Sequence, residues 1–289
     1  MAVLSIQSHV VYGYAGNTAA VFPLQRLGRE VWAVNTVEFS NHTGYGSWRG
    51  IVLGAQLVSD LVTGLEERGA LTRCDAVLSG YLGDASIGKA IIESVKKVRD
   101  SNANAIYCCD PVMGDTGRGF YVKPDIPDMF KNELIPLADI ICPNQFELEV
   151  ITGIEIKTIK DALKAINKIH EMGPSVVLVT SFKEEHGKLS MIASDKKNMY
   201  KTTTTELNLG NNAAGTGDMT TAVFLSRYME TKDIKTTLEL CTASVFGVLE
   251  SSYKGSIKNN KNLIELKIID EQHQFISPSY SFKAEQIQL

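Results

Sequence analysis

The chain has 289 residues, of which 44% are hydrophobic, and its formal net charge at pH 7 is −4. A globular chain of this length buries roughly three quarters of the surface that its unfolded form exposes, so it needs no disulfide bonds to fold. The acidic charge balance argues against a nucleic-acid-binding surface, and no apolar run approaches the ~20 residues that a membrane helix requires. The sequence therefore favours a small molecule as the partner, and neither a nucleic acid nor a membrane.

The cysteines and the amino terminus indicate the compartment. The five cysteines show neither the spacing of a metal site nor the framework of a secreted protein, and several lie in apolar runs. Residues 1–11 form a short apolar run that Gln7, Ser8 and His9 interrupt, without a basic leader or a cleavage site. We therefore expect a strand at the start of the chain, a reducing environment and a cytoplasmic location.

Short runs rich in branched side chains predict strands that are buried on both faces of a sheet. In chain order these runs cover residues 2–7, 31–39, 76–79, 105–109, 139–142 and 176–180. Between them, Leu57, Leu61 and Leu65 predict the inner face of one helix. Thr158 and Asp161 predict a capping box at the start of another helix. Strands that alternate with helices predict a mainly parallel sheet with helices on both faces.

The pattern changes after residue 181. Residues 188–206 predict a hairpin at the sheet edge, with a polar turn at 195–198, and two long helices are expected at 217–230 and 234–253. A segment rich in Lys and Asn at 256–262 predicts a solvated loop, and residues 270–289 carry little signal. Because no linker or repeat divides the chain, we expect residues 1–289 to form one domain.

The strongest candidate site is the segment Gly215-Thr216-Gly217-Asp218, which directly precedes an apolar helical pattern. Glycines at a helix start let a ligand approach the backbone, and the unpaired amides and the positive end of the helix dipole favour an anion. The preceding residues 211–214, Asn211 and Asn212 among them, are too small to block the helix end. An ordinary helix cap also places a carboxylate in the first turn, so the pattern alone leaves a cap and a phosphate site as alternatives.

Polar side chains also follow two of the predicted strands. Asp110 ends the run 105–109 and can face a metal–phosphate complex, although Asp-Pro pairs also form ordinary turns. Asn144 and Glu147 follow the run 139–142 at a spacing that can order magnesium and its waters. Taken alone, Glu147 is better explained as an acid that complements a helix dipole. Residues 117–121 can form a movable cover over a bound nucleotide.

A polar and aromatic loop follows the second predicted strand. Residues 40–48 have the sequence SNHTGYGSW, and with Ser8 and His9 they suit the recognition of a flat, polar small molecule. His9 and His42 can equally be satisfied by backbone groups, and neither lies at a spacing that suggests zinc.

Several motifs occur together and in a fixed order along most of the chain. They are SIQSHVVYGYAGN at 5–17, FSNHTGYGSW at 39–48, LSGYLG at 78–83, CDPVMGD at 109–115, NQFE at 144–147 and GTGD at 215–218. In this combination they resemble the pyridoxal kinases of the ribokinase-like superfamily. The resemblance implies an α/β fold, a three-layer α/β/α sandwich with a mainly parallel central sheet and a small lid. It further implies a homodimeric kinase that uses ATP, Mg²⁺ and a monovalent cation, K⁺ or Na⁺, to phosphorylate pyridoxal and related vitamers.

The resemblance also implies roles for matching positions. Asp218 would accept the proton of the substrate's hydroxymethyl group, and an anion hole around the transferred phosphoryl group would consist of Gly215, Thr216 and Gly217. Contacts to the substrate are implied for Ser8, Val10, Val37, His42, Thr43 and Tyr81. Contacts to ATP are implied for Asp110, Asp115, Asn144, Glu147, Thr180 and Ser181. Asp110 and Glu147 would also bind the metal, and Tyr121 would lie in the lid.

Three alternatives stay open on the sequence. The nearest is a hydroxymethylpyrimidine kinase, which shares the anion hole and the base. A dinucleotide-binding oxidoreductase would need a G-x-G-x-x-G turn after the first strand, which residues 13–16 (GYAG) do not supply. A binding protein without catalysis would lack the base at position 218. The chain also lacks a G-x-x-x-x-G-K-[ST] loop and the protein-kinase motifs, which disfavours those two kinase types.

Overall fold

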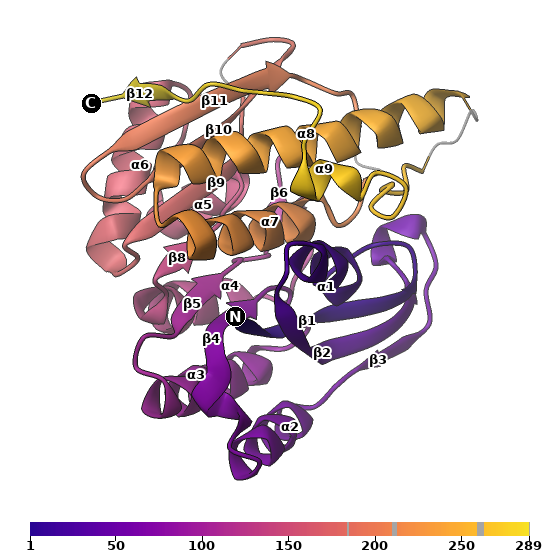
Figure 1. Cartoon of the computed structure of the whole chain (residues 1–289), viewed down its shortest axis with the longest axis vertical. Coiled ribbons are helices and arrows are strands. Elements are labelled where there is room, and N and C mark those ends of the chain that lie inside the picture. Colours follow the sequence, from indigo (N-terminus) through magenta and orange to yellow (C-terminus); the bar gives the residue numbers. More distant parts are fainter. Residues whose placement is uncertain (184, 210–212, 259–262, 289) are drawn as a thin grey trace.

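Ten strands of the described chain form one sheet, and helices pack around it (Figure 1). The computed structural model describes residues 1–183, 185–209, 213–258 and 263–288. Across the sheet the strands are β12 (Glu285–Ile287), β11 (Met199–Thr205), β10 (Lys188–Ser194), β9 (Val176–Phe182), β8 (Ile140–Ile141), β5 (Ile106–Cys109), β4 (Cys74–Ser79), β1 (Ala2–Tyr12), β2 (Glu30–Asn41) and β3 (Gly50–Val52).

The centre of the sheet is parallel, as the alternation of strands and helices predicted. The strands from β2 through β1, β4, β5 and β8 to β9 pair in parallel. β10, β11 and β12 extend one edge as antiparallel strands, and β3 extends the other. The predicted hairpin at 188–206 is confirmed, but β12 pairs with β11 outside it. The carboxyl-terminal segment, in which the sequence showed little signal, therefore contributes the outermost strand.

Helices cover both faces of the sheet, and each face has its own hydrophobic core. One face carries α1 (Asn17–Arg26), α7 (Thr216–Thr231), α8 (Ile234–Lys258) and α9 (His273–Ile276). The other carries α2 (Ala55–Glu67), α3 (Ala85–Ser101), α4 (Ile126–Met129), α5 (Gln145–Thr152) and α6 (Ile159–Met172). Along β9, Val176 and Leu178 belong to the first core, and Val177 and Val179 belong to the second. The predicted α/β/α sandwich is confirmed, and the central strands are mainly apolar because both of their faces are covered.

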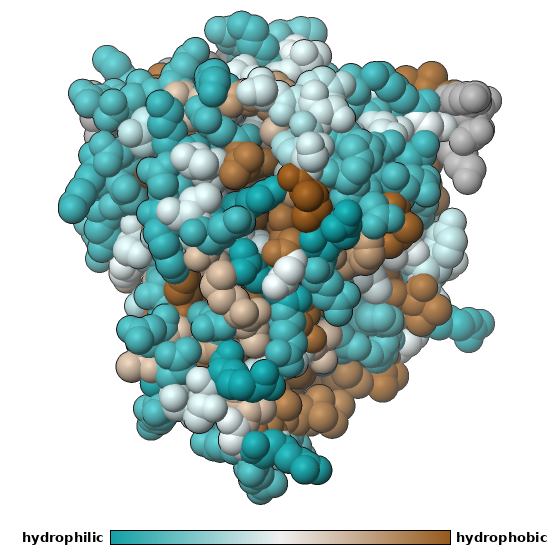
Figure 2. Space-filling model, viewed as in Figure 1, coloured by the Kyte–Doolittle hydropathy of each residue, from teal (hydrophilic) through white to brown (hydrophobic). Residues whose placement is uncertain are grey.

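The predicted inner face of α2 is wrong for Leu57 and Leu61, whereas Leu65 packs against the core as expected. Val58 and Val62 are fully buried, whereas Leu57 and Leu61 are 41% and 46% exposed. The helix carries apolar residues on two faces, so its periodicity fits either orientation, and contacts with α3 and β2 select the valine face. The leucines join Ile51 and Val52 of β3 among the exposed large apolar side chains. In Figure 2, apolar side chains gather on the surface over α2 and β3, toward the lower right.

Two strands of the sheet are longer than predicted, which changes the setting of two site residues, Ser8 and Ser181. β1 pairs with β2 as far as Tyr12, and the register shifts between Gln7 and His9. Ser8 therefore lies at an irregularity inside the strand and not after its end, and such irregularities commonly redirect a side chain. β9 continues to Phe182, which pairs with Ser190 of β10, so Ser181 lies within the strand and not after its end.

Local sequence signals predicted the start of α6 more closely than they predicted the ends of these strands. Thr158 and Asp161 form the expected capping box at the start of α6. α8 extends to Lys258, so the predicted loop at 256–262 begins as helix, and its residues 259–262 lie outside the described part of the chain. All five cysteines are buried thiols. Within the described ranges, none of the helices combines the length and the apolar character that a bilayer span requires.

Candidate active site

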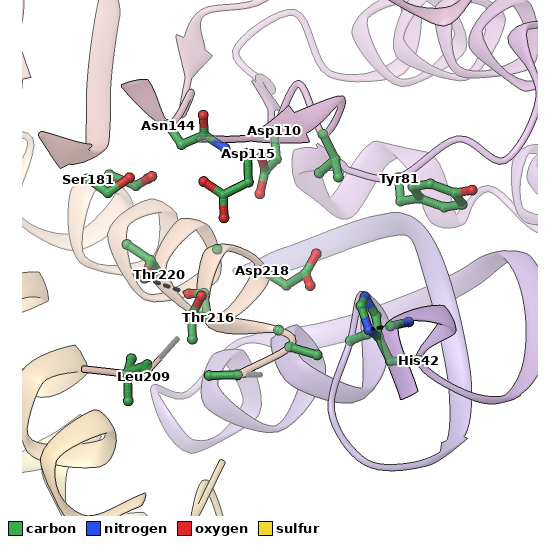
Figure 3. Close-up of a pocket in the computed structure, with 18 of the residues that line it drawn as sticks. His42, Tyr81, Asp110, Asp115, Asn144, Ser181, Leu209, Thr216, Asp218 and Thr220 are labelled. Carbon is green, nitrogen blue, oxygen red and sulfur yellow. Dashed lines mark hydrogen bonds between the residues drawn. The ribbon is translucent and has the colours of Figure 1, made fainter. Parts of the chain in front are cut away.

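A cleft with a volume of about 520 Å³ opens at the carboxyl ends of the parallel strands, where the sequence predicted the site. Figure 3 shows Asp110, Asp115 and Asn144 across from the start of α7, with Ser181 toward one end and Tyr81 toward the other. Of the site residues that the family resemblance implies, only Val37 does not line this cleft. Val37 is fully buried in a small apolar cluster with Val10 and Phe39, so it supports the wall from behind.

The amino end of α7 faces the cleft because Gly215 permits a close backbone approach. Gly215 caps the helix with φ of 79°, and a Cβ atom at this position would lie 2.4 Å from the carbonyl oxygen of Tyr14. No other residue type fits that contact without moving the helix start. Thr216 and Gly217 then begin the helix, where backbone amides have no partner within the helix. These amides are the donors that the predicted anion hole would use.

Asp218 lies in the first turn of α7 and lines the cleft between Thr216 and His42 (Figure 3). Its carboxylate accepts hydrogen bonds from the backbone amides of Gly16 and of Asp218 itself. The side chain therefore partly caps its own helix, as one alternative expected, and still borders the cleft. Burial raises the pKa of Asp218 above its ordinary value although both hydrogen bonds lower it. A raised pKa makes a carboxylate a stronger proton acceptor.

Gly16 connects Asp218 to the first strand. A Cβ atom on Gly16 would lie 2.2 Å from the carbonyl oxygen of Ser8 and 2.3 Å from its hydroxyl oxygen. Because Gly16 lacks that atom, its backbone packs directly against Ser8 while its amide donates to Asp218. The serine at the irregularity in β1 is thereby held beside the candidate base.

Asp110 is one of several carboxylates that crowd the centre of the cleft. It is 4% exposed, and its Oδ2 atom accepts a hydrogen bond of 2.9 Å from the Thr221 hydroxyl on α7. Burial and then the negative charges of Glu147 and Asp218 raise the pKa of Asp110 well above its ordinary value. Mutual repulsion of this kind favours the binding of a cation.

Glu147 lies in the first turn of α5. The sequence left two roles open for it: an acid that complements the helix dipole and a ligand that orders magnesium. It is 3% exposed, and its carboxylate accepts the amides of Met113 at 3.0 Å and Asn144 at 2.9 Å. Asn144 Oδ1 accepts the Glu147 amide in return, which completes a capping box. Burial raises the pKa of Glu147 to about 8 although the backbone hydrogen bonds lower it. Glu147 therefore caps α5 and also lines the cleft.

The carboxylates suit a magnesium ion that is shared with a nucleotide. Within the residues that the structure describes, no group of three or more His, Cys, Asp or Glu side chains is arranged to enclose a metal. Mg²⁺ commonly uses only one or two carboxylates and completes its shell with water and substrate phosphates. Asp110 and Glu147 fit that kind of site, because both are buried oxygen donors and a cation would relieve the repulsion at Asp110.

One end of the cleft contains His42, Thr43 and Tyr81, for which the family resemblance implies contacts to the substrate. His42 Nδ1 accepts the Gly44 amide at 3.1 Å, and burial, with Arg118 nearby, lowers the pKa of His42. The imidazole is therefore neutral near pH 7 and fits a flat, uncharged surface. His9 does not reach this cleft, because its Nδ1 lies 2.9 Å from the Glu38 carboxylate and its ring lines a separate hollow.

The other end of the cleft is lined by Thr180 and Ser181, for which the resemblance implies contacts to ATP. Apolar side chains from β10 lie beside them. Next to the cleft, β6 (Gly114–Asp115) and β7 (Gly119–Phe120) form a small two-stranded sheet. Tyr121 follows β7, and its amide donates to the Met113 carbonyl at 3.1 Å. Burial raises the pKa of Asp115, which also lines the cleft. The hairpin occupies the place expected for the lid.

Sequence inspection missed three residues that complete the site: Gly16, Thr221 and Arg118. Gly16 was visible only as part of a longer motif. Thr221 lies three residues after Asp218, on the same face of one helix turn, which is a signal that could have been used. Arg118 lines the cleft from the turn of the hairpin and carries a charge suited to phosphate. No sequence signal separates Arg118 from the other basic residues.

Two glycines of the anion hole provide a matched pair of substitutions. Gly215→Ala is expected to lower both stability and activity, because its Cβ would collide with the Tyr14 carbonyl at a positive φ. Gly217→Ala should instead keep or raise stability by up to ~1 kcal/mol, because Gly217 is helical and a Cβ there meets no atom within 4 Å. We still expect Gly217→Ala to lower kcat/KM for ATP roughly tenfold, because the methyl group enters the phosphate space. Thermal melting and steady-state kinetics check both; a fully active Gly217→Ala would argue against an anion hole here.

Comparisons with known proteins agree with this geometry. A family model described as phosphomethylpyrimidine kinase matches residues 65–261. This match and the α/β/α fold place the chain among the ribokinase-like small-molecule kinases. A pyridoxal kinase PdxY of Rubrobacter xylanophilus is 46% identical, and the match covers 99% of this chain and 97% of that protein. The corresponding protein of Granulibacter bethesdensis is 44% identical, with 99% of each chain covered. The chain belongs to the pyridoxal kinase family.

Solved structures show the same relationship. The pyridoxal kinase of Leishmania donovani in complex with ADP and pyridoxamine has a TM-score of 0.90, 30% sequence identity and 99% coverage of each chain. The Plasmodium falciparum PdxK with AMP-PNP and PL has a TM-score of 0.83 and 26% identity, again with 99% of each chain covered. The predicted family and fold are therefore confirmed.

Proposed function

We propose that this chain transfers the terminal phosphoryl group of ATP to the 5′-hydroxymethyl group of pyridoxal, giving pyridoxal 5′-phosphate, and that it also accepts pyridoxine and pyridoxamine. The observation that carries the proposal is the position of Asp218, a carboxylate in the first turn of α7 that borders the cleft. Family membership supports the substrate class, because full-length relatives are pyridoxal kinases and a related structure holds ADP with pyridoxamine.

In this proposal Asp218 acts as the general base. A primary alcohol is too weak an acid to lose its proton before reaction, so a carboxylate takes the proton late in the transition state. The proton moves to Asp218 while the alcohol oxygen attacks the terminal phosphorus of ATP and ADP leaves. Amides at the start of α7 stabilise the charge of the transferred group, and Gly16 and Ser8 hold the base in place.

The remaining predicted site residues divide between two ends of the cleft. Pyridoxal would lie against Ser8, Val10, His42, Thr43 and Tyr81. ATP would lie toward Asp115, Asn144, Thr180 and Ser181. Asp110 and Glu147 would hold Mg²⁺, which neutralises phosphate charge when it is bound. We also propose a monovalent cation, K⁺ or Na⁺, as a further cofactor.

An assay of purified protein tests the function. With Mg-ATP, conversion of pyridoxal to its 5′-phosphate is expected, together with slower or comparable turnover of pyridoxine and pyridoxamine. Chelation of Mg²⁺ should abolish the reaction, and readdition should restore it. The rival is a hydroxymethylpyrimidine kinase, which the description of the matching family model favours. Turnover of the pyrimidine alcohol without turnover of pyridoxal would transfer the assignment to that rival.

We further propose that residues 1–289 form one domain and that two copies associate as a cytoplasmic homodimer. The sheet that runs unbroken from β12 to β3 supports a single domain. Dimerisation would double the mass of 31.6 kDa, which sedimentation or light scattering can measure. A monomer at micromolar concentration would contradict this part of the proposal.

A further inference from the structure

The loop that carries His42 and Thr43 extends beyond the edge of the sheet. We define residues 42–48 as the substrate loop. Its base is fixed, because β2 and β3 pair and the Ser40 amide donates to the Arg49 carbonyl at 2.7 Å. None of the loop residues is fully buried, so packing alone does not hold its tip. The loop needs another contact to keep its two cleft residues in place.

Tyr45 provides that contact. Its hydroxyl donates a hydrogen bond of 2.6 Å to Oε1 of Glu265, a residue 220 positions later in the chain. The two segments lie side by side in Figure 1, where the yellow carboxyl-terminal part meets the purple loop after β2. A hydrogen bond from a phenol to a carboxylate is charge-assisted and stronger than a neutral one.

Glu265 is a firm anchor because the residues on both sides of it are buried. Ile264 is 6% exposed and Leu266 is 2% exposed. Gly13 packs against the contact from the other direction, and a Cβ atom there would lie 3.0 Å from both the Tyr45 hydroxyl and Glu265 Oε2. The junction therefore joins three segments that are far apart in the chain, and the loop has no fully buried residue of its own.

The contact is transmitted to the cleft within the loop. The Tyr45 and His42 rings form an edge-to-face pair with centroids 5.9 Å apart. His42 Nδ1 also accepts the Gly44 amide and thereby caps the short turn Thr43–Tyr45. Fixing Tyr45 consequently fixes the turn that presents His42 and Thr43 to the cleft.

We propose that Glu265 is a positioning residue for the alcohol substrate, which acts through Tyr45 to hold the substrate loop in its binding conformation. This inference rests on the proposed function, because it takes His42 and Thr43 to contact pyridoxal. A loop that is ordered before binding loses less entropy when the substrate binds. The nucleotide end lies on the far side of Asp218, so its affinity should not depend on the junction.

Kinetics of three variants test the inference. Tyr45→Phe and Glu265→Ala are expected to raise KM for pyridoxal roughly tenfold and to leave KM for ATP within about twofold. Glu265→Gln keeps an acceptor for the phenol and should recover most of the loss. Tyr12→Phe is the matched control. The Tyr12 and Tyr45 rings form an edge-to-face pair with centroids 6.4 Å apart, and this change removes a hydroxyl next to Tyr45 but leaves the Tyr45–Glu265 hydrogen bond intact. Unchanged KM for pyridoxal in both Tyr45→Phe and Glu265→Ala would overturn the inference while the proposed function stood.

Limited proteolysis gives a second measurement that needs no activity. Chymotrypsin cleavage after Trp48 requires the substrate loop to leave its folded position, and mass spectrometry can quantify that cut. We expect cleavage at least about fivefold faster in Tyr45→Phe and Glu265→Ala than in the wild type and in Tyr12→Phe. If the wild type does not phosphorylate pyridoxal, the proposed function fails, and the cleavage rate still decides whether Glu265 holds the loop. Equal losses for ATP and pyridoxal with a lower melting temperature would show a merely structural role and overturn the inference.

Discussion

Asp218→Asn is expected to lower kcat for pyridoxal by ~10²-fold or more and to leave KM for pyridoxal within about twofold. Asparagine has the shape of aspartate and can still accept the Gly16 amide, so the cleft should keep its geometry. The amide cannot take up the proton of the substrate alcohol, so the loss should fall on the chemical step. Steady-state kinetics with Mg-ATP measure both constants.

Stability separates a catalytic loss from a folding defect in this variant. Burial raises the pKa of Asp218 above its value in an unfolded chain, so the ionised carboxylate destabilises the folded state at neutral pH. The neutral amide should therefore leave the melting temperature unchanged or raise it. Asp233→Asn is a suitable control, because Asp233 accepts the Thr236 amide at the start of α8 and does not line the cleft. If Asp218→Asn keeps near-normal kcat, Asp218 is not the base.

Glu147→Ala is expected to be the most damaging single change for stability among those considered. The substitution removes the acceptor of two backbone amides, at Met113 and Asn144, and with it the capping box of α5. Each buried donor left without a partner costs roughly 1–3 kcal/mol, so the free energy of unfolding should fall by roughly 2–4 kcal/mol. Denaturant titration measures this change.

Glu147→Gln divides the structural role from the role in metal binding. Glutamine can still accept one of the two amides, so the loss of stability should be smaller than in Glu147→Ala. It lacks the negative charge, so the Mg²⁺ concentration needed for half-maximal activity should rise at least about tenfold. Glu155→Ala serves as the control, because Glu155 pairs with Lys157 at an exposed position and should change stability by less than ~0.5 kcal/mol. Wild-type Mg²⁺ dependence in Glu147→Gln would remove Glu147 from the metal site.

The sequence by itself determined the architecture of the centre of the molecule. Strands such as 176–180 are mainly apolar because both sheet faces are covered, and that pattern is encoded locally. The capping signal at Thr158 and the glycine at 215 are local as well, because each meets a backbone requirement at a helix start. The family motifs likewise named residues that all line the cleft, apart from Val37.

Only the tertiary structure decided which of several locally equivalent faces is used. Periodicity could not choose between the leucine and valine faces of α2, because both are apolar and the choice depends on α3 and β2. The irregularity that directs Ser8 into the cleft arises from pairing between two strands, and neither strand encodes it alone. The contacts from Gly16 to Asp218 and from Tyr45 to Glu265 join segments far apart in the chain, so no local pattern could reveal them. Short-range signals set the elements, whereas contacts between distant residues set the orientation of the side chains in the site.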